Sequence, residues 1–266
     1  MKLADCGLGF GSAPNGGKGG ELYTVSRTDD NAVNPSPGTL RYGVTRDGPL
    51  WITFWQRNGP CIILLNGNNV IIHGLNIHNC QPSKSGMIFL AEGTQAEEIE
   101  TQDGDDISVS YFPDVWIDHN TLFNCSDRLV HVTLPSTADT ISNNRFSYHD
   151  MVMLLGHSDD YRADKAMKVT VAFNHFGPGL IERMPRLTLF NLITLLEIGM
   201  KQVQTWAIEA IIDYRRFRIG VTLIPDEVAL GNQVVIGYRE DCKEAMSKSD
   251  GSSLGHLSAI GYWSSL

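Results

Sequence analysis

The feature that most constrains the fold is a repeated strand-and-corner pattern in the middle of the chain. Each copy consists of a short apolar strand, a polar corner and an apolar residue two places further on, and the copies lie at 70–77, 115–122, 140–146 and 170–176. Asparagines occupy equivalent corners at Asn120, Asn144 and Asn174, which are 24 and 30 residues apart. A period in this range is typical of repeat architectures, and strand-rich repeats without helical periodicity favour a parallel β-helix over a helical solenoid.

A parallel β-helix gives the corner asparagines a specific role. Equivalent residues of neighbouring coils stack about 4.8 Å apart, so Asn120, Asn144 and Asn174 would form a hydrogen-bonded ladder that replaces water for the turn amides. The alternative is that asparagine is simply common in turns. Three asparagines in register favour the ladder.

Composition excludes several classes of protein. The chain has 266 residues, of which 42% are hydrophobic and 19% are charged, which predicts a buried core and argues against disorder. The net charge of −9 argues against a nucleic-acid partner, and an acidic polymer would need a local basic patch or a bridging cation. We expect no membrane-spanning helix, because no run of 18 apolar residues occurs, and the first residues do not resemble a signal peptide.

The clearest candidate for metal binding is the run Asp103-Gly104-Asp105-Asp106, which precedes an expected strand at 107–110. Asp103 and Asp105 point to the same side of an extended chain, and converging carboxylates suit Ca²⁺. Asp127 lies on the following coil and could reach the same face. The alternative is a solvated turn, which is the commoner meaning of Asp-Gly-Asp alone. The five cysteines form no Cys-x-x-Cys pair, which argues against a zinc site.

Two further groups of residues are candidates for catalysis or binding. Asp118 and His119 place an acid beside an imidazole, but no Gly-x-Ser-x-Gly elbow is present, so we expect them to build a coil corner rather than a hydrolase triad. Arg183 and Arg186 flank a proline, and the planar arginine fork suits carboxylate recognition, although a solvated loop is the alternative. After Arg186 the pattern changes. Residues 202–218 could be helical, and we expect no further coil.

Together, the motifs identify a family. The chain resembles the plant pectate lyases, most closely the conifer pollen members, over about residues 1–186. The runs that carry the resemblance are 3–6, 9–11, 16–20, 23–25, 33–35, 37–43, 49–52, 103–105, 116–120, 141–144, 152–157, 168–174 and 183–186. The expected organisation is a β-helix over 1–186 and a divergent segment over 187–266.

The resemblance implies an all-β, right-handed parallel β-helix, here truncated and followed by an irregular or partly helical tail. It implies Ca²⁺-dependent β-elimination of de-esterified pectin by a polysaccharide lyase in the cell wall. The implied partner is polygalacturonate, an acidic polysaccharide, with no nucleic acid and no membrane, and the implied state is a monomer.

Site residues follow from the same resemblance. It assigns catalysis to Arg183, substrate binding to Arg186 and His157, and calcium to Asp103, Asp105 and Asp127. The family's fourth calcium acid falls at His131, and imidazole is a poor ligand for Ca²⁺. The resemblance also implies a Cys61–Cys80 disulfide and an unpaired Cys6, because the family's usual partner of that cysteine lies before Met1.

The chain departs from the family at several positions. Arg128 replaces the usual glycine, Thr188 replaces the second arginine of the Arg183 motif, and Asp150 replaces a substrate-binding lysine. About one coil is missing between Phe54 and Pro60. These departures leave two alternatives open: a catalytically impaired, pectin-binding or allergen-like protein from a disrupted gene, and a chain that does not fold stably.

Overall fold

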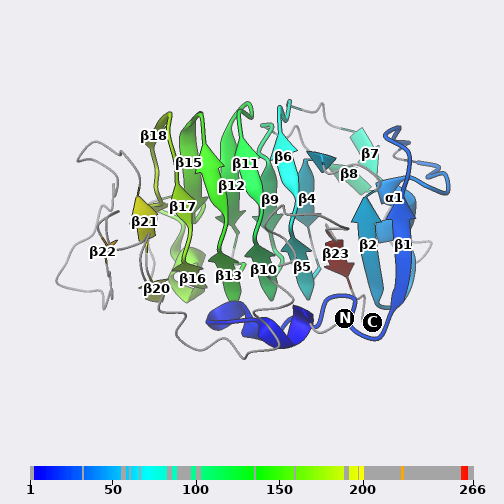
Figure 1. Cartoon of the computed structure of the whole chain (residues 1–266), viewed down its shortest axis with the longest axis horizontal. Coiled ribbons are helices and arrows are strands. Elements are labelled where there is room, and N and C mark those ends of the chain that lie inside the picture. Colours follow the sequence, from blue (N-terminus) through cyan, green and yellow to red (C-terminus); the bar gives the residue numbers. More distant parts are fainter. Residues whose placement is uncertain are drawn as a thin grey trace, which may run out of the picture.

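The computed structural model is a stack of parallel strands arranged in three sheets (Figure 1). It describes residues 3–31, 33–54, 61–65, 67–82, 103–134, 136–158 and 160–188 with their side chains. Outside these ranges it describes the backbone of short strands at 58–59, 86–88, 97–99, 192–196, 198–200, 223–224 and 259–262. The predicted parallel β-helix is confirmed.

In the central coils the chain passes through the three sheets in turn, and the sheets are called A, B and C here. Sheet A contains, in order, β1 (Glu21–Val25), β2 (Leu50–Phe54), β23 (Ala259–Tyr262), β5 (Val70–His73), β10 (Val115–Asp118), β13 (Asp139–Ser142), β16 (Lys168–Ala172) and β20 (Leu192–Leu196). Sheet B contains β22 (Leu223–Ile224), β21 (Ile198–Met200), β17 (His175–Phe176), β14 (Arg145–Ser147), β11 (Thr121–Phe123), β6 (Asn76–His78) and β3 (Asn58–Gly59).

Sheet C lies next to the site residues that the sequence predicts. It contains β18 (Leu180–Glu182), β15 (His149–Leu155), β12 (Arg128–Thr133), β9 (Ile107–Ser110) and β4 (Ile62–Leu65), with β19 (Arg186–Leu187) also paired to β15. A separate antiparallel pair consists of β7 (Gly86–Ile88) and β8 (Glu97–Ile99). The short helices are η1 (Leu3–Cys6), η2 (Phe10–Ser12), α1 (Leu40–Val44) and η4 (Arg162–Ala166). None of the helices in the described part of the chain is long and apolar enough to cross a membrane.

The strand register explains why the four sequence copies look alike. Trp116 of β10 lies between Ile71 of β5 and Thr140 of β13, and Thr140 lies beside Thr170 of β16. The interior is filled by aliphatic and aromatic side chains from all three sheets, such as Phe146. Burial of this apolar surface is the main stabilising contribution.

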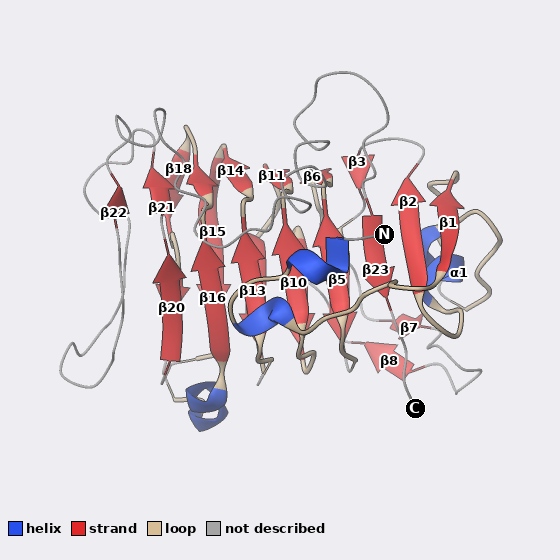
Figure 2. Ribbon diagram, turned by 60° about the horizontal axis from the view of Figure 1, so that its bottom comes forward, coloured by secondary structure: helices blue, strands red, loops and turns tan. Residues whose placement is uncertain are grey.

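The N-terminal helices cover the outer face of sheet A (Figure 2). Backbone amides of Phe10 and Gly11 donate to the hydroxyls of Thr170 (3.0 Å) and Thr140 (2.8 Å). A Cβ at Gly11 would lie 2.5 Å from the backbone nitrogen of Thr140, so only glycine permits this approach. Strands β5, β10 and β13 are therefore buried on both faces.

The predicted asparagine ladder is present. The side-chain oxygen of Asn144 accepts from the backbone amide (2.9 Å) and side-chain amide (3.0 Å) of Asn120. Asn174 accepts the same pair of bonds from Asn144, at 2.9 and 3.1 Å. Asn120 in turn accepts from the backbone amide of Leu75 at 2.9 Å. Each asparagine thus pairs the buried turn amide of the preceding coil, which water cannot reach.

Strand pairing continues beyond Arg186, which corrects the expected end of the coils. Strand β20 pairs with β16, β21 pairs with β17, and both pairings are parallel. The sequence did not reveal this coil because the run at 187–198 is almost wholly apolar with no clear period and lacks the corner asparagine. The expected helix at 202–218 lies outside the described residues.

Strand β23 lies antiparallel between β2 and β5 (Figure 1). The sequence places the missing coil between these two strands, so a segment from the C-terminal end takes that position in sheet A.

The structure shows how the cysteines of the described residues are paired. Cys61 and Cys80 form a disulfide with a Cα–Cα distance of 5.7 Å. The expectation that Cys6 is unpaired is wrong, because Cys6 is disulfide-bonded. The free cysteine within the described ranges is Cys125.

Candidate functional site

The acidic run and Asp127 meet at one edge of sheet C. Asp105 lies two residues before β9, and Asp127 directly precedes β12. These strands are parallel with Val130 opposite Ile107, so the same register brings Asp105 beside Arg128. The backbone amide of Arg128 donates to Asp105 Oδ1 at 3.0 Å, and the amide of Asp106 donates to the carbonyl of Arg128 at 2.9 Å.

We call Asp103, Asp105, Asp127, Arg128 and His131 the acid cluster. Arg128 Nη1 donates to Asp127 Oδ2 and lies 3.8 Å from Asp105 Oδ1. His131 Nδ1 lies 3.3 Å from Asp105 Oδ2. Asp103 is exposed, whereas the other four side chains are largely buried. The arrangement is an ion-paired group, with both nitrogen-bearing side chains directed at the carboxylates.

Burial dominates the electrostatics beneath this cluster. It raises the pKa of Asp127, while the charge of Arg128 acts in the opposite direction. Burial, together with the neighbouring Asp105, raises the pKa of Asp106 to about 9, and neither of its carboxylate oxygens has a hydrogen-bond partner. Asp106 is therefore a neutral acid at pH 7. Burial also raises the pKa of Cys125, whose thiol donates to the Arg128 carbonyl at 3.0 Å, so this cysteine is no nucleophile.

The acid cluster does not fit calcium as it is arranged. Calcium takes six to eight oxygen ligands at roughly 2.3–2.6 Å. In the described ranges, the group with converging metal-ligand atoms is His73, Asp118 and His119, and no such group forms among the carboxylates of the acid cluster. Nitrogen atoms already face both oxygens of Asp105. The residues that the resemblance assigns to calcium are neighbours, but the oxygens of Asp105 and Asp127 are directed at nitrogen atoms of Arg128 and His131.

Arg183 lies further along the same sheet. In register, Arg128 of β12 pairs with Met151 of β15, and Met151 pairs with Glu182 of β18, the residue before Arg183. Two strand spacings separate these positions, roughly 10 Å. Arg183 has a left-handed backbone (φ 59°), its Nε lies 3.2 Å from Glu182 Oε1, and its carbonyl accepts from the amide of Met153 at 2.7 Å.

Arg186 and His157 are placed differently. Arg186 begins β19 opposite Leu154, one short turn from Arg183. His157 is exposed and follows the end of β15, four residues beyond Met153 and so roughly 13 Å along the strand direction. His157 is thus further along the sheet from Arg183 than from Arg186, whose register partner Leu154 lies three residues before His157.

Thr188 replaces an arginine of the family pattern and has its own partner here. Its hydroxyl donates to Asp164 Oδ2 at 2.9 Å, and the backbone amide of His157 donates to the same oxygen at 2.6 Å. Asp164 is fully buried, and its Oδ1 has no partner. Thr188 thus supplies one hydrogen bond to Asp164 but no positive charge.

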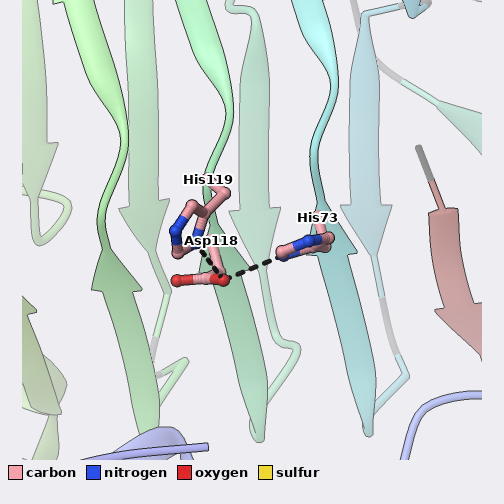
Figure 3. A group of neighbouring side chains, drawn as sticks. All are labelled: His73, Asp118 and His119. Atoms are coloured by element: carbon pink, nitrogen blue, oxygen red, sulfur yellow. Dashed lines mark hydrogen bonds and ion pairs between the residues drawn. The ribbon is translucent and has the colours of Figure 1, made fainter. Parts of the chain in front are cut away.

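A second polar group, the histidine corner, lies where β5 and β10 end in sheet A (Figure 3). His73 Nδ1 lies 2.8 Å and His119 Nδ1 lies 2.6 Å from the same oxygen of Asp118. Ser142 Oγ and Asn143 Nδ2 donate to its other oxygen at 2.7 and 2.9 Å. Burial alone would raise the pKa of Asp118, but the two imidazoles hold it below its usual range.

The histidine corner supports the structural interpretation of Asp118 and His119. Ser142 is fully buried and its hydroxyl donates to a carboxylate, not to a histidine, so it is not an activated nucleophile. The sequence analysis did not predict that His73 belongs to this group. Alignment of the repeat copies would have indicated it, because His73 occupies the position of Asp118 in the preceding copy.

The fold and the site define a class of protein: a parallel β-helix with acidic and arginine side chains along one sheet. The chain belongs to the pectate lyase family. A family model described as "Pectate lyase" matches residues 56–193. The chain is 47% identical over 272 residues to "Pectate lyase 1" of Chamaecyparis obtusa, covering 92% of this chain and 69% of the relative. The similarity therefore extends beyond residues 1–186.

Other relatives give the same result. The chain is 46% identical to "Pectate lyase 1" of Hesperocyparis arizonica, covering 79% of this chain and 64% of the relative. It is 48% identical to "Probable pectate lyase 16" of Arabidopsis thaliana, covering 69% and 53%. The crystal structure of jun a 1, the major allergen from cedar pollen, superposes with a TM-score of 0.69 at 44% identity, covering 85% of this chain and 70% of that chain. The family is typically calcium-dependent.

Proposed function

We propose that this chain is a lyase that binds de-esterified pectin along sheet C and cleaves it by β-elimination. The observation that supports this most directly is the placement of Arg183 and Arg186 on the same sheet as the acid cluster, in a chain 47% identical to pectate lyase 1. The chain spans roughly two thirds or less of the length of its relatives, so its activity is a proposal. Pectin is a cell-wall polymer, which implies an extracellular site of action.

The reaction requires stabilisation of negative charge. The C5 proton of a uronate lies next to the carboxylate. A hydroxide ion from solvent takes that proton to give water and an enolate-like carbanion, because Arg183 stays charged. A C4–C5 double bond then forms as the C4–O bond breaks, and the departing oxygen takes a proton from water, which releases the leaving chain. We assign the catalytic role to Arg183. The charge on its guanidinium neutralises the uronate carboxylate and stabilises the developing anion.

A base role for Arg183, which the family resemblance implies, would need a neutral guanidinium. Arginine holds its proton strongly, and Glu182 at 3.2 Å favours the charged form further. Arg186, close by on β19, suits the carboxylate of an adjacent sugar because its planar fork donates two parallel hydrogen bonds. In relatives that use calcium, the metal would supply further neutralisation of carboxylates. The acid cluster does not fit that ion here, and no step of this proposal passes through it.

The test is incubation of the purified chain with polygalacturonate, followed by ultraviolet absorbance of the unsaturated uronate product. We expect a steady rise in absorbance that Arg183→Ala reduces by about 100-fold or more, the usual effect of removing one stabilising donor. Arg145→Ala is the matched control, because this exposed arginine lies on β14 in sheet B. New reducing ends without absorbance would indicate hydrolysis and contradict the proposal.

One observation favours a second candidate, a pectin-binding protein without activity. Thr188 leaves the Arg183 motif one positive charge short and is engaged with Asp164. In that case polygalacturonate in a native gel would retard the chain, and no absorbance would develop. Thr188→Arg would then be expected to restore cleavage.

A further inference from the structure

Arg128 occupies the centre of the acid cluster because of strand register. It is the first residue of β12, directly after Asp127, and its backbone amide donates to Asp105 Oδ1 at 3.0 Å. The Asp106 amide returns a bond to the Arg128 carbonyl at 2.9 Å. These two backbone hydrogen bonds fix the Cα atom of Arg128 beside the acidic run. The side chain of Arg128 therefore lies close to the carboxylates of Asp105 and Asp127.

The guanidinium is directed into the cluster and not into solvent. Its Nη1 bonds Asp127 and lies 3.8 Å from Asp105 Oδ1. The side chain is 17% exposed, and its Nε is buried without a hydrogen-bond partner. A guanidinium keeps its charge at every pH that a folded protein tolerates, so this positive charge is permanent.

His131 occupies the remaining side of Asp105. Its Nδ1 lies 3.3 Å from Asp105 Oδ2, whereas Oδ1 already accepts from the Arg128 amide. Both oxygens of Asp105 therefore face nitrogen. A calcium ion needs several oxygen ligands and binds imidazole poorly, so His131 removes one ligand and covers another.

We propose that Arg128 is a built-in cation that takes the place of a divalent metal ion in this cluster, and that with His131 it makes the acid cluster independent of calcium. A dication entering the cluster would meet a fixed guanidinium a few ångströms away. It would have to displace that group from Asp127 without gaining a fourth carboxylate. The proposal concerns metal binding, so it stands apart from whether the chain cleaves pectin.

The first test uses the unaltered chain and calcium alone. Calorimetric titration with CaCl₂ is expected to show no binding heat beyond that of a MgCl₂ titration, and the melting temperature is expected to be equal in the two salts. Saturable calcium binding that Asp105→Asn abolishes would overturn the proposal. This measurement is decisive even when a variant fails to fold.

The second test restores the family residues, with Arg128→Gly and His131→Asp combined. We expect calcium affinity to rise by at least about tenfold, and the melting temperature in CaCl₂ to rise by roughly 2–4 °C. Asp105→Asn in the same background should remove the gain. Arg145→Gly is the matched control, since Arg145 also begins a strand but lies in sheet B, and it should behave as the unaltered chain does. A folded double variant that gains no calcium binding would also overturn the proposal.

Discussion

The histidine corner and the acid cluster are made of the same components, a carboxylate on one coil and nitrogen groups on its own and the adjacent coil. They differ in how completely those components are paired. At the histidine corner, four donors within 2.9 Å satisfy both oxygens of Asp118. In the acid cluster, Arg128 Nε and His131 Nε2 are buried without partners.

The difference separates a fully paired polar group from an incompletely paired one. Stacking of parallel strands brings polar side chains of adjacent coils together whatever their purpose. When every polar atom is paired, the group stabilises the corner and offers nothing to a ligand. When some are left unpaired, desolvation has a cost that an incoming carboxylate can offset. Four experiments test this contrast, in order of decreasing effect.

The largest effect is expected for Asp118→Ala. Removing the carboxylate leaves the donors of His73, His119 and Ser142 buried without their acceptor, which should lower the free energy of unfolding by about 3–5 kcal/mol. Urea denaturation at pH 7 measures this. Asp118→Asn is the matched control, because it keeps an acceptor oxygen and should cost less. A loss below about 1 kcal/mol would show that the corner contributes little.

A smaller loss is expected for Asp105→Ala in the acid cluster. Asp105 accepts one backbone bond and lies near the Arg128 guanidinium and the His131 imidazole, so the expected loss is about 1–2 kcal/mol in the same denaturation experiment. Part of that loss is offset because Arg128 can still pair with Asp127. If Asp105→Ala cost as much as Asp118→Ala, the two groups would be equivalent and the contrast would fail.

A matched pair of histidines isolates the contribution of pairing. The side chains of His119 and His131 are 18% and 16% exposed, so they bury similar fractions of their surface. Their carboxylate contacts differ, at 2.6 Å for His119 and 3.3 Å for His131. His119→Ala should cost about 1 kcal/mol and His131→Ala about 0.5 kcal/mol or less. Thermal melts at pH 7 with equal losses would remove this distinction.

The smallest effect is expected in the pH dependence of the free energy of unfolding. Asp139 is buried like Asp118, but no imidazole contributes to the shift of its pKa. Burial raises the pKa of Asp139 well above the usual value. Its stabilising contribution is therefore present below about pH 4 and is lost as pH rises toward its folded-state pKa. Asp139→Asn should flatten the decline in stability above pH 4. An unchanged slope between pH 4 and 8 would contradict this origin.

Much of the fold could be predicted because a strand-and-corner pattern repeats along the sequence. Asn120, Asn144 and Asn174 marked the coil corners directly, and the structure confirms the ladder they form. The burial of strands such as β10 followed from their apolar runs. The acid cluster could be predicted as a neighbourhood, since the run at 103–106 and Asp127 lie on adjacent coils.

The remainder depended on information that no local pattern carries. The guanidinium of Arg128 donates a hydrogen bond to Asp127 because of the side-chain geometry in the folded protein. The amino-acid sequence shows only that an arginine follows Asp127. The partner of Asp118 at His73 is 45 residues away and appears only when two coils are aligned. The coil formed by β20 and β21 lacks the corner signature, so its apolar run had no interpretable period.

The asparagine ladder also restricts how a chain of this kind can change its length. Each rung serves two coils, since Asn144 accepts from Asn120 and donates to the carbonyl of Ile117 while relying on Asn174 for its own amide. Removal of part of a coil would leave unmatched groups on both sides, whereas loss of a whole coil joins two compatible rungs. The spacings of 24 and 30 residues show that the segments between rungs differ in length. Insertions and deletions should therefore accumulate as loops or as complete coils, with the rungs as the units of change.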